Sequence, residues 1–385
     1  MARLLVMGDF SQSRMHSQGD LLGRLVDGGH RVVVATSASS TGVASIDANR
    51  SIRRRAVAMP DESAKRRCDL EAIWQLHRLL RQESPQFFCA YTVRHLVYGM
   101  LAGWLADSPM RSVLLTGLKT APSAPEDTRR YLLQRGASML YRLSQNTEGS
   151  VVFDNRDEAY VFCARRLVDH PGQVLLVDAR GVDTGAYRPV AMPDGARFLY
   201  AGPLGTSQGI VEYVQAARRI RHHNRDVQFQ IVGWPEYGDD GVDRRQLQSW
   251  VAGEAVEYLG RPDDIGAAIA DASVVVSPPH RPGAPGGVLE AMAMGRPVVT
   301  TDVDGCRQAV DYGANGYCVQ PGDVEGLARA MTHFVGEPDL RRTMGACSRN
   351  KAVDRFDIDD VAIGLMEAME LKFQRVPPPL PSDVG

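Results

Sequence analysis

The sequence predicts an α/β protein with two domains, each built on a Rossmann-like, doubly wound parallel sheet. Short β-branched runs alternate with segments of helical periodicity, an order typical of parallel strands joined by crossover helices. The alternation occurs twice, before and after a stretch at 181–195 that contains Pro189 and Pro193 and few apolar residues. A chain of 385 residues also exceeds what one hydrophobic core usually serves, which favours two domains.

The first half is expected to form one sheet with its helices. A helix at 17–27 should end at Gly28 and Gly29, because paired glycines are a common stop signal. A second helix at 69–81 places its leucines and Ile73 on one face. Strands are predicted at 3–7, 31–36, 112–116 and 151–153.

The second half repeats the pattern with stronger signals. Its predicted strands are 197–201, 227–232, 256–259, 273–277 and 298–300, and its predicted helices are 210–221, 289–294 and 324–334. An amphipathic helix at 356–373 should close the fold. We place the domains at 1–183 with the returning helix 356–375, a linker at 184–196, the second domain at 197–355 and a flexible tail at 376–385.

Composition narrows the class of protein. Apolar residues make up 44% and charged residues 23%, the balance of a globular chain. The start reads as a strand and a polar loop without a basic leader, and the apolar run 97–106 is too short to span a membrane. The six cysteines form no C-x-x-C pair, so neither a zinc site nor a disulfide framework is indicated. We therefore expect a cytoplasmic protein with no metal and no resident cofactor.

The stretch 277–299 carries the clearest indication of a binding site. A predicted strand ends in a Pro/Gly loop, the loop enters a helix near Gly286, and the helix stops at Gly295. The first amides of a helix have no partner within the helix and carry the positive end of its dipole, so this loop could hold a phosphate. Glu290, about one turn inside, could accept hydrogen bonds from a ribose diol. The alternative is a plain turn in which Glu290 only caps these amides.

This stretch, together with 300–307 and 315–323, resembles the C-terminal domain of family 4 glycosyltransferases, in particular the bacterial members that build polysaccharides on undecaprenyl diphosphate. Further similar segments follow in family order over most of the chain, from 70–80 to the terminal helix. The resemblance implies the GT-B fold, with two Rossmann-like domains facing across a cleft. It also implies metal-independent transfer of a sugar from a nucleotide donor, here expected to be a UDP-sugar, with retention at the anomeric carbon.

The resemblance assigns a set of donor-binding positions to the second half. These positions are Gly202, Gln208, Arg261, Gly286, Gly287, Val288 and Glu290. The sequence departs from the family at three charged places, because Pro203 stands for an Arg, Gln208 for a Lys and Pro282 for a Glu. No catalytic residue can be named on this basis, and His280 and Arg281 are the candidates.

Other side chains could supply the missing charge or act as acid and base. Arg281, Lys119, Arg261 and Arg94 could each reach a diphosphate, although the more common role of such residues is that of a surface cation or a partner in a structural ion pair. His16, His95 and His280 are candidates for proton transfer, and the alternative for each is a merely solvated or packed histidine.

Two functional hypotheses follow, and both involve nucleotide sugars. The first is a transferase of bacterial envelope polysaccharide synthesis that uses a polyprenyl-linked or saccharide acceptor. The second is a degenerate homologue that acts as a non-catalytic partner of an active transferase, and a phosphorylase or epimerase on the same fold is a distant third. The basic runs 53–55 and 65–67 could touch lipid headgroups at the inner membrane face, or could simply be solvated. No nucleic-acid partner is expected.

Overall fold

The structure is a computed structural model of the whole chain. The residues it describes are 2–8, 15–37, 52–57, 68–90, 93–108, 112–115, 150–153, 159–160, 163, 174–177, 180–234, 240–262, 264–280 and 286–370.

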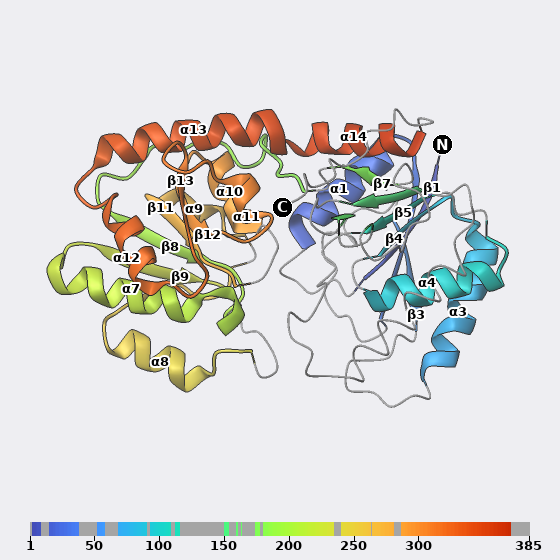
Figure 1. Cartoon of the computed structure of the whole chain (residues 1–385), viewed down its shortest axis with the longest axis horizontal. Helices are drawn as coiled ribbons and strands as arrows, with labels where there is room; N and C mark the ends of the chain where they lie inside the picture. The colour runs from blue at the N-terminus through green and yellow to red at the C-terminus, as the bar shows by residue number, and fades with distance from the viewer. Residues whose placement is uncertain are drawn as a thin grey trace, which may run out of the picture. The chain divides into compact units, whose positions relative to one another are not determined.

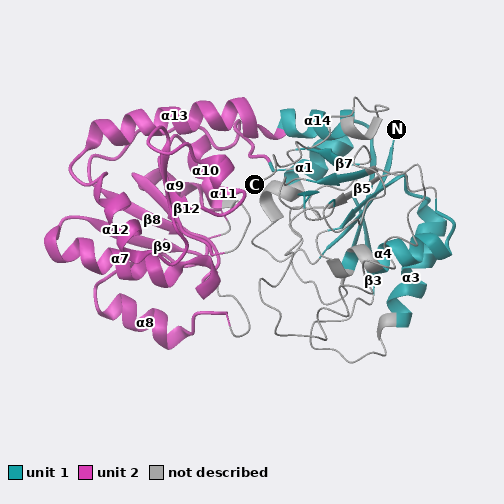
Figure 2. Ribbon diagram, viewed as in Figure 1, with its two compact units in different colours: residues 1–180, 359–385 teal, residues 181–358 magenta. Residues whose placement is uncertain are grey.

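The chain divides into two compact units (Figure 2). Unit 1 comprises Met1–Arg180 with Asp359–Gly385, and unit 2 comprises Gly181–Ile358. The residues that we expected to form the linker, 184–196, are therefore grouped with unit 2.

Unit 1 contains a parallel sheet in the order β3-β2-β1-β4-β5-β6-β7 (Figure 1). Its strands are β1 (Arg3–Met7), β2 (Arg31–Ser37), β3 (Arg53–Val57), β4 (Phe87–Ala90), β5 (Ser112–Leu115), β6 (Ser150–Phe153) and β7 (Val174–Leu176). Its described helices are α1 (Met15–Asp27), α3 (Cys68–Glu83), α4 (Val93–Leu105) and most of α14 (Ile358–Glu370). The strands and helices predicted for this half are all present, whereas β3, β4, β7 and α4 were not predicted.

The basic run 53–55 forms part of the edge strand β3. Arg54 donates from Nε to Thr36 Oγ1 at 3.2 Å, and Arg55 lies 3.7 Å from Glu83, which also pairs with Arg31. Charged side chains on an edge strand oppose pairing with a further strand. Arg54 and Arg55 therefore make contacts within unit 1, while the run 65–67 lies outside the described residues.

Unit 2 contains the second parallel sheet, in the order β10-β9-β8-β11-β12-β13. Its strands are β8 (Arg197–Ala201), β9 (Gln228–Val232), β10 (Glu257–Tyr258), β11 (Val274–Ser277), β12 (Val298–Thr301) and β13 (Gly316–Val319). Its helices are η3 (Thr206–Gln208), α7 (Ile210–His223), α8 (Arg244–Ala252), α9 (Gly266–Asp271), α10 (Gly286–Ala293), α11 (Cys306–Ala309), α12 (Val324–Thr332) and α13 (Pro338–Phe356).

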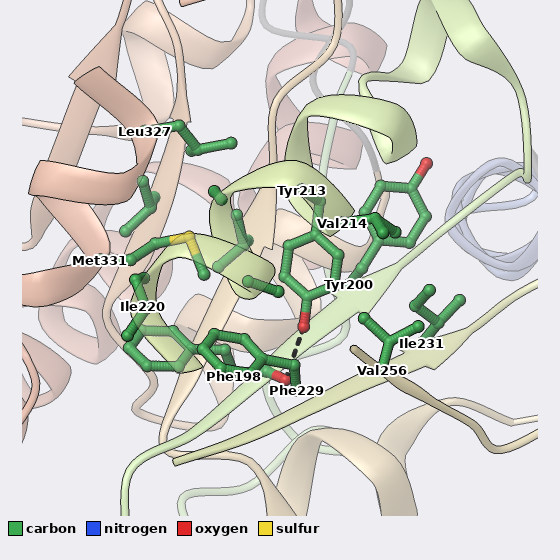
Figure 3. Packing of buried hydrophobic residues seen from close by; sticks show 14 of the residues in the cluster. Phe198, Tyr200, Tyr213, Val214, Ile220, Phe229, Ile231, Val256, Leu327 and Met331 are labelled. Carbon is green, nitrogen blue, oxygen red and sulfur yellow. Dashed lines mark hydrogen bonds between the residues drawn. The ribbon is translucent and has the colours of Figure 1, made fainter. Parts of the chain in front are cut away.

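Both faces of this sheet are buried, which explains its nearly continuous apolar strands. Successive side chains of a strand point to opposite faces, so Phe198 and Tyr200 join the cluster under α7 and α12, whereas Leu199 joins the cluster under α10 and α13. Figure 3 shows the first cluster, in which Tyr213 of α7 donates its hydroxyl to the Phe198 carbonyl at 2.8 Å. Burial raises the Tyr213 pKa well above its ordinary value, so the hydroxyl stays a donor. This bond fixes the position of α7 relative to β8.

Three arginines bind the backbone of 184–196 to unit 2. Arg296 and Arg341 are almost fully buried, at 0% and 2% exposure, and both donate to carbonyls of this segment, as does Arg349. The acceptors on the segment are the carbonyls of Thr184, Tyr187, Val190, Ala191 and Asp194. Although most of its side chains are exposed, as a linker's would be, its backbone is anchored.

The described part of the chain ends with two helices, α13 and α14, where one helix at 356–373 was predicted. α13 stops at Phe356, and Val182 forms a bridge with Asp357 before α14 begins. α14 then packs against α1 through an Arg24–Asp359 ion pair of 2.8 Å. Its Met366 lies so close to Gly28 that a Cβ there would stand 2.6 Å from the sulfur.

Among the described residues, none of the helices combines the length and apolarity that crossing a membrane requires. The same part of the chain holds no group of three His, Cys, Asp or Glu side chains placed to bind a metal ion.

Candidate functional site

The topology of unit 2 points to one position for a ligand. β9 follows β8 in the chain and lies on one side of it, whereas β11 lies on its other side, so the strand order reverses between β8 and β11. In doubly wound sheets, ligands bind outside the carboxyl ends of the strands at such a switch point. The loops that follow β8 and β11 are therefore the candidate site.

The loop after β8 is tightly built and runs from Gly202 to Gly209. The Tyr200 hydroxyl donates to the Pro203 carbonyl at 2.6 Å, and Asp240 accepts hydrogen bonds from Ser207. Gly209 has φ of +75°, and a Cβ there would lie 1.8 Å from the Pro278 carbonyl oxygen. Only glycine fits at this crossing of the two loops.

The loop after β11 is fixed to its neighbours from both sides. Thr300 donates from Oγ1 to the Ser277 carbonyl at 2.7 Å, and the Thr301 hydroxyl donates to the Pro279 carbonyl. On the other side, the His280 amide donates to the Ser207 carbonyl at 2.9 Å. The loop is thus bound to β12 and to the loop after β8, up to the point where the described residues stop at His280.

Helix α10 begins at Gly286, and its first turn reaches the end of β8. A Cβ on Gly287 would lie 3.1 Å from the Ala201 carbonyl oxygen, so this close approach favours glycine. Val288 is fully buried, which means that only its backbone amide could meet a ligand. Glu290, the fifth residue of the helix, is 7% exposed.

Arg261 lies at the same edge of the sheet, just beyond β10. Gly233, after β9, donates its amide to the Gly260 carbonyl at 3.0 Å, and a Cβ on Gly233 would lie 1.9 Å from the Gly202 carbonyl oxygen. Arg261 is exposed, and its charge partly offsets the rise that burial causes in the pKa of Tyr258.

The structure adds one pair that the sequence did not predict. His280 Nε2 lies 3.1 Å from Glu212 Oε1, with the two side chains 34% and 17% exposed. Glu212 is in the first turn of α7. In the sequence it shows only as an acid near a helix start, a common feature with no ligand-binding meaning.

The remaining sequence candidates divide into two groups. His95 is described and is 3% exposed on α4 of unit 1, as expected for a packed histidine. The side chains of His16 and Arg94, and the residues Lys119, Arg281 and Pro282, lie outside the described part of the chain. Unit 2 brings together the loops that carry Gly202, Gln208, Gly286, Gly287, Val288, Glu290 and His280, with Arg261 along the same edge.

Comparison with known proteins tests the predicted family resemblance. Residues 195–337 match the family model described as Glycosyl transferases group 1. A relative from Campylobacter jejuni, N,N'-diacetylbacillosaminyl-diphospho-undecaprenol alpha-1,3-N-acetylgalactosaminyltransferase, is 22% identical over 305 residues, covering 76% of this chain and 78% of the relative. The capsular polysaccharide biosynthesis glycosyltransferase CapM of Staphylococcus aureus is 26% identical over 296 residues, covering 75% and 77%.

A solved structure shares the fold over nearly the whole chain. HepE of Anabaena, crystallised in complex with UDP, superposes with a TM-score of 0.73 at 17% identity, covering 96% of this chain and 99% of HepE. The predicted resemblance is confirmed: the fold is GT-B, residues 195–337 match the glycosyl transferases group 1 model, and these two relatives are bacterial glycosyltransferases.

Proposed function

Since residues 195–337 form a glycosyl transferases group 1 domain, we propose that this chain transfers a sugar from a UDP-sugar to a lipid-linked or saccharide acceptor of bacterial envelope polysaccharide synthesis. The transfer would retain the anomeric configuration and would proceed at the inner face of the membrane. The observation that carries the proposal is the switch point of unit 2, where the glycine-lined end of β8 meets the amide end of α10.

The first turn of α10 would bind the donor diphosphate. Its leading amides point out of the helix with the positive end of the dipole, and Gly286 and Gly287 let a ligand approach the backbone. These amides would stabilise the charge that develops on the UDP leaving group as the glycosidic bond breaks. Glu290 would accept hydrogen bonds from the ribose, and Arg261 would lie beside the base.

The names of similar proteins support the choice of substrates. The Campylobacter relative is named for transfer to an undecaprenol-linked saccharide, and HepE was crystallised with UDP. The matches cover 78% of the Campylobacter relative and 99% of HepE.

The second candidate function is that of a non-catalytic partner of an active transferase. It is favoured by Pro203 and Gln208, the residues that stand where the resemblance expects two cations. Losing one donor to a developing negative charge costs roughly 3 to 4 kcal/mol of transition-state stabilisation. A partner protein would bind a UDP-sugar without turning it over.

Calorimetric titration with UDP-glucose, UDP-N-acetylglucosamine, GDP-mannose and ADP-glucose tests the proposal. We expect one UDP-sugar to bind and to raise the melting temperature with its concentration. Release of UDP in the presence of a polyprenyl-linked acceptor would support the transferase, whereas binding without release would support the partner role. If no nucleotide sugar binds, both functions are wrong.

Replacing Glu290 with glutamine should weaken binding of the UDP-sugar by about 10-fold or more, because the ribose hydroxyls would then donate to a neutral amide oxygen instead of a charged carboxylate. Titration calorimetry measures the change. Glu325→Gln is the control, since Glu325 on α12 is an exposed partner of Arg219 on α7 and its substitution should leave binding unchanged. If Glu290 only caps helix amides, its substitution will lower the melting temperature and leave the affinity intact.

A further inference from the structure

We propose that His280, held by Glu212, is the cationic group that meets the donor diphosphate, so that donor binding takes up a proton. This inference rests on the proposed function and assigns the charge at the same site. Neither residue of the pair stands at one of the positions where the resemblance expects a phosphate-binding cation.

The need for a charge follows from the composition of the site. A nucleotide-sugar diphosphate carries two negative charges. Among the described residues of the three segments that meet at the switch point, 202–209, 277–280 and 286–290, the one side chain able to become positive is that of His280. Helix amides supply only partial charges, so a full cation within reach would add substantially to diphosphate binding.

The position of His280 is fixed through its backbone and through its ring. Its amide donates to Ser207, next to Gln208, and the preceding loop crosses Gly209 at the start of α7. Nε2 is engaged with Glu212 at 3.1 Å, which leaves Nδ1, without a partner among the described residues, as the ring atom available to a ligand. The neutral ring would present a lone pair at Nδ1, whereas the protonated ring presents an N–H donor. An anion at Nδ1 therefore requires the protonated form.

Glu212 makes binding of the diphosphate depend more strongly on protonation of His280. Its second oxygen, Oε2, is buried and has no hydrogen-bond partner within the described residues. With a neutral His280 the pair has a net charge of −1 beside the diphosphate, and protonation brings it to zero. Both the new donor at Nδ1 and the removal of this repulsion make binding of the anion depend on the proton.

The described elements that adjoin these loops carry several acidic groups, beside the cations Arg261 and Arg307. Asp240 holds the loop after β8, Glu290 lies on α10, and Asp302 and Asp304 follow β12, whose Thr301 is bonded to Pro279. The Arg307 guanidinium lowers the pKa of Asp302, and carboxyl groups ordinarily titrate near pH 4.

The test is a titration of the wild-type protein with the UDP-sugar that binds it, from about pH 6 to about pH 8. A nucleotide sugar is a suitable probe because its diphosphate, esterified at both ends, keeps a constant charge over this range. We expect the affinity to fall by about 10-fold across it, and calorimetry in buffers of different ionisation enthalpy should show proton uptake. Uridine, which has no phosphate, should bind without this dependence.

Three variants complete the design. His280→Gln should bind weakly at every pH, His280→Lys should bind tightly at every pH, and Glu212→Gln should reduce the pH dependence. His223→Gln, at the opposite end of α7, is the matched control and should keep the wild-type profile.

The outcomes separate this proposal from the function on which it rests. If the wild type binds a UDP-sugar but His280→Gln binds it equally well with the same pH profile, the role of His280 is overturned and the proposed function stands. If the wild type binds none of the four nucleotide sugars, both fail. Recovery of binding by His280→Lys would support the charge and would not follow from a purely structural role.

Discussion

Replacing Gly209 with alanine is expected to lower the free energy of unfolding of unit 2 by about 2 to 4 kcal/mol, combining left-handed backbone strain with overpacking. At φ of +75° a side chain is strained, and its Cβ would stand 1.8 Å from the Pro278 carbonyl oxygen. Backbone cannot be moved aside by a rotamer change, so the loops after β8 and β11 must separate. Urea unfolding, followed by hydrogen exchange of peptides from unit 2, measures the loss.

Gly322 is the control that separates strain from collision. Its φ is +79°, nearly the same as that of Gly209, but nothing lies within 4 Å of a Cβ built there. Gly322→Ala should therefore cost only about 1 kcal/mol, the price of the backbone conformation alone. Equal losses in the two variants would show that the contact between the two loops contributes nothing to stability.

The same substitution should also weaken donor binding. The crossing at Gly209 fixes the loop of Gly202 and Gln208 against the one that ends in His280. If those loops hold the diphosphate, Gly209→Ala should reduce affinity for the UDP-sugar under conditions where the protein is still folded. Gly322→Ala should not.

The parts of the fold that the sequence predicted are those whose own residues carry the signal. β8, β11 and β12 are buried on both faces, so their apolar runs are visible without knowledge of their neighbours. β3 was missed because its three arginines contradict strand propensity, and only pairing with β2 makes the strand. α13 was missed because Arg341, Gly345 and Ser348 occupy buried positions where an apolar stripe would be expected.

The site residues also divide into those that a local sequence pattern predicts and those that it does not. The loop that enters α10 and the acid one turn later are local features, so Gly286, Gly287 and Glu290 could be proposed from spacing alone. Glu212 and His280 are 68 positions apart and meet only because β8 and β11 are neighbours in the sheet. No local pattern encodes such a pair, and its finding required the topology.

Replacing Arg296 with methionine is expected to cost unit 2 about 4 kcal/mol of unfolding free energy, because four backbone carbonyls would lose a charged donor. The buried guanidinium donates to Ile269 and Ala270 at the end of α9 and to Val190 and Ala191 of the anchored segment. Burial lowers the Arg296 pKa, yet a guanidinium titrates so far above neutrality that it remains charged. Urea unfolding measures the loss.

Arg342→Met on α13 is the control, since this exposed arginine pairs with the exposed Asp339 at 2.7 Å and its loss should cost less than about 1 kcal/mol. The loss of unfolding free energy in Arg296→Lys should lie between those of Arg296→Met and Arg342→Met, because an ammonium cannot place donors on four carbonyls in the fork geometry of a guanidinium. Faster hydrogen exchange at 186–194 in Arg296→Met would show that the arginine anchors this segment to α9. Unchanged exchange there, with stability lost elsewhere, would mean that the segment is held without it and that Arg296 serves only the packing of α9.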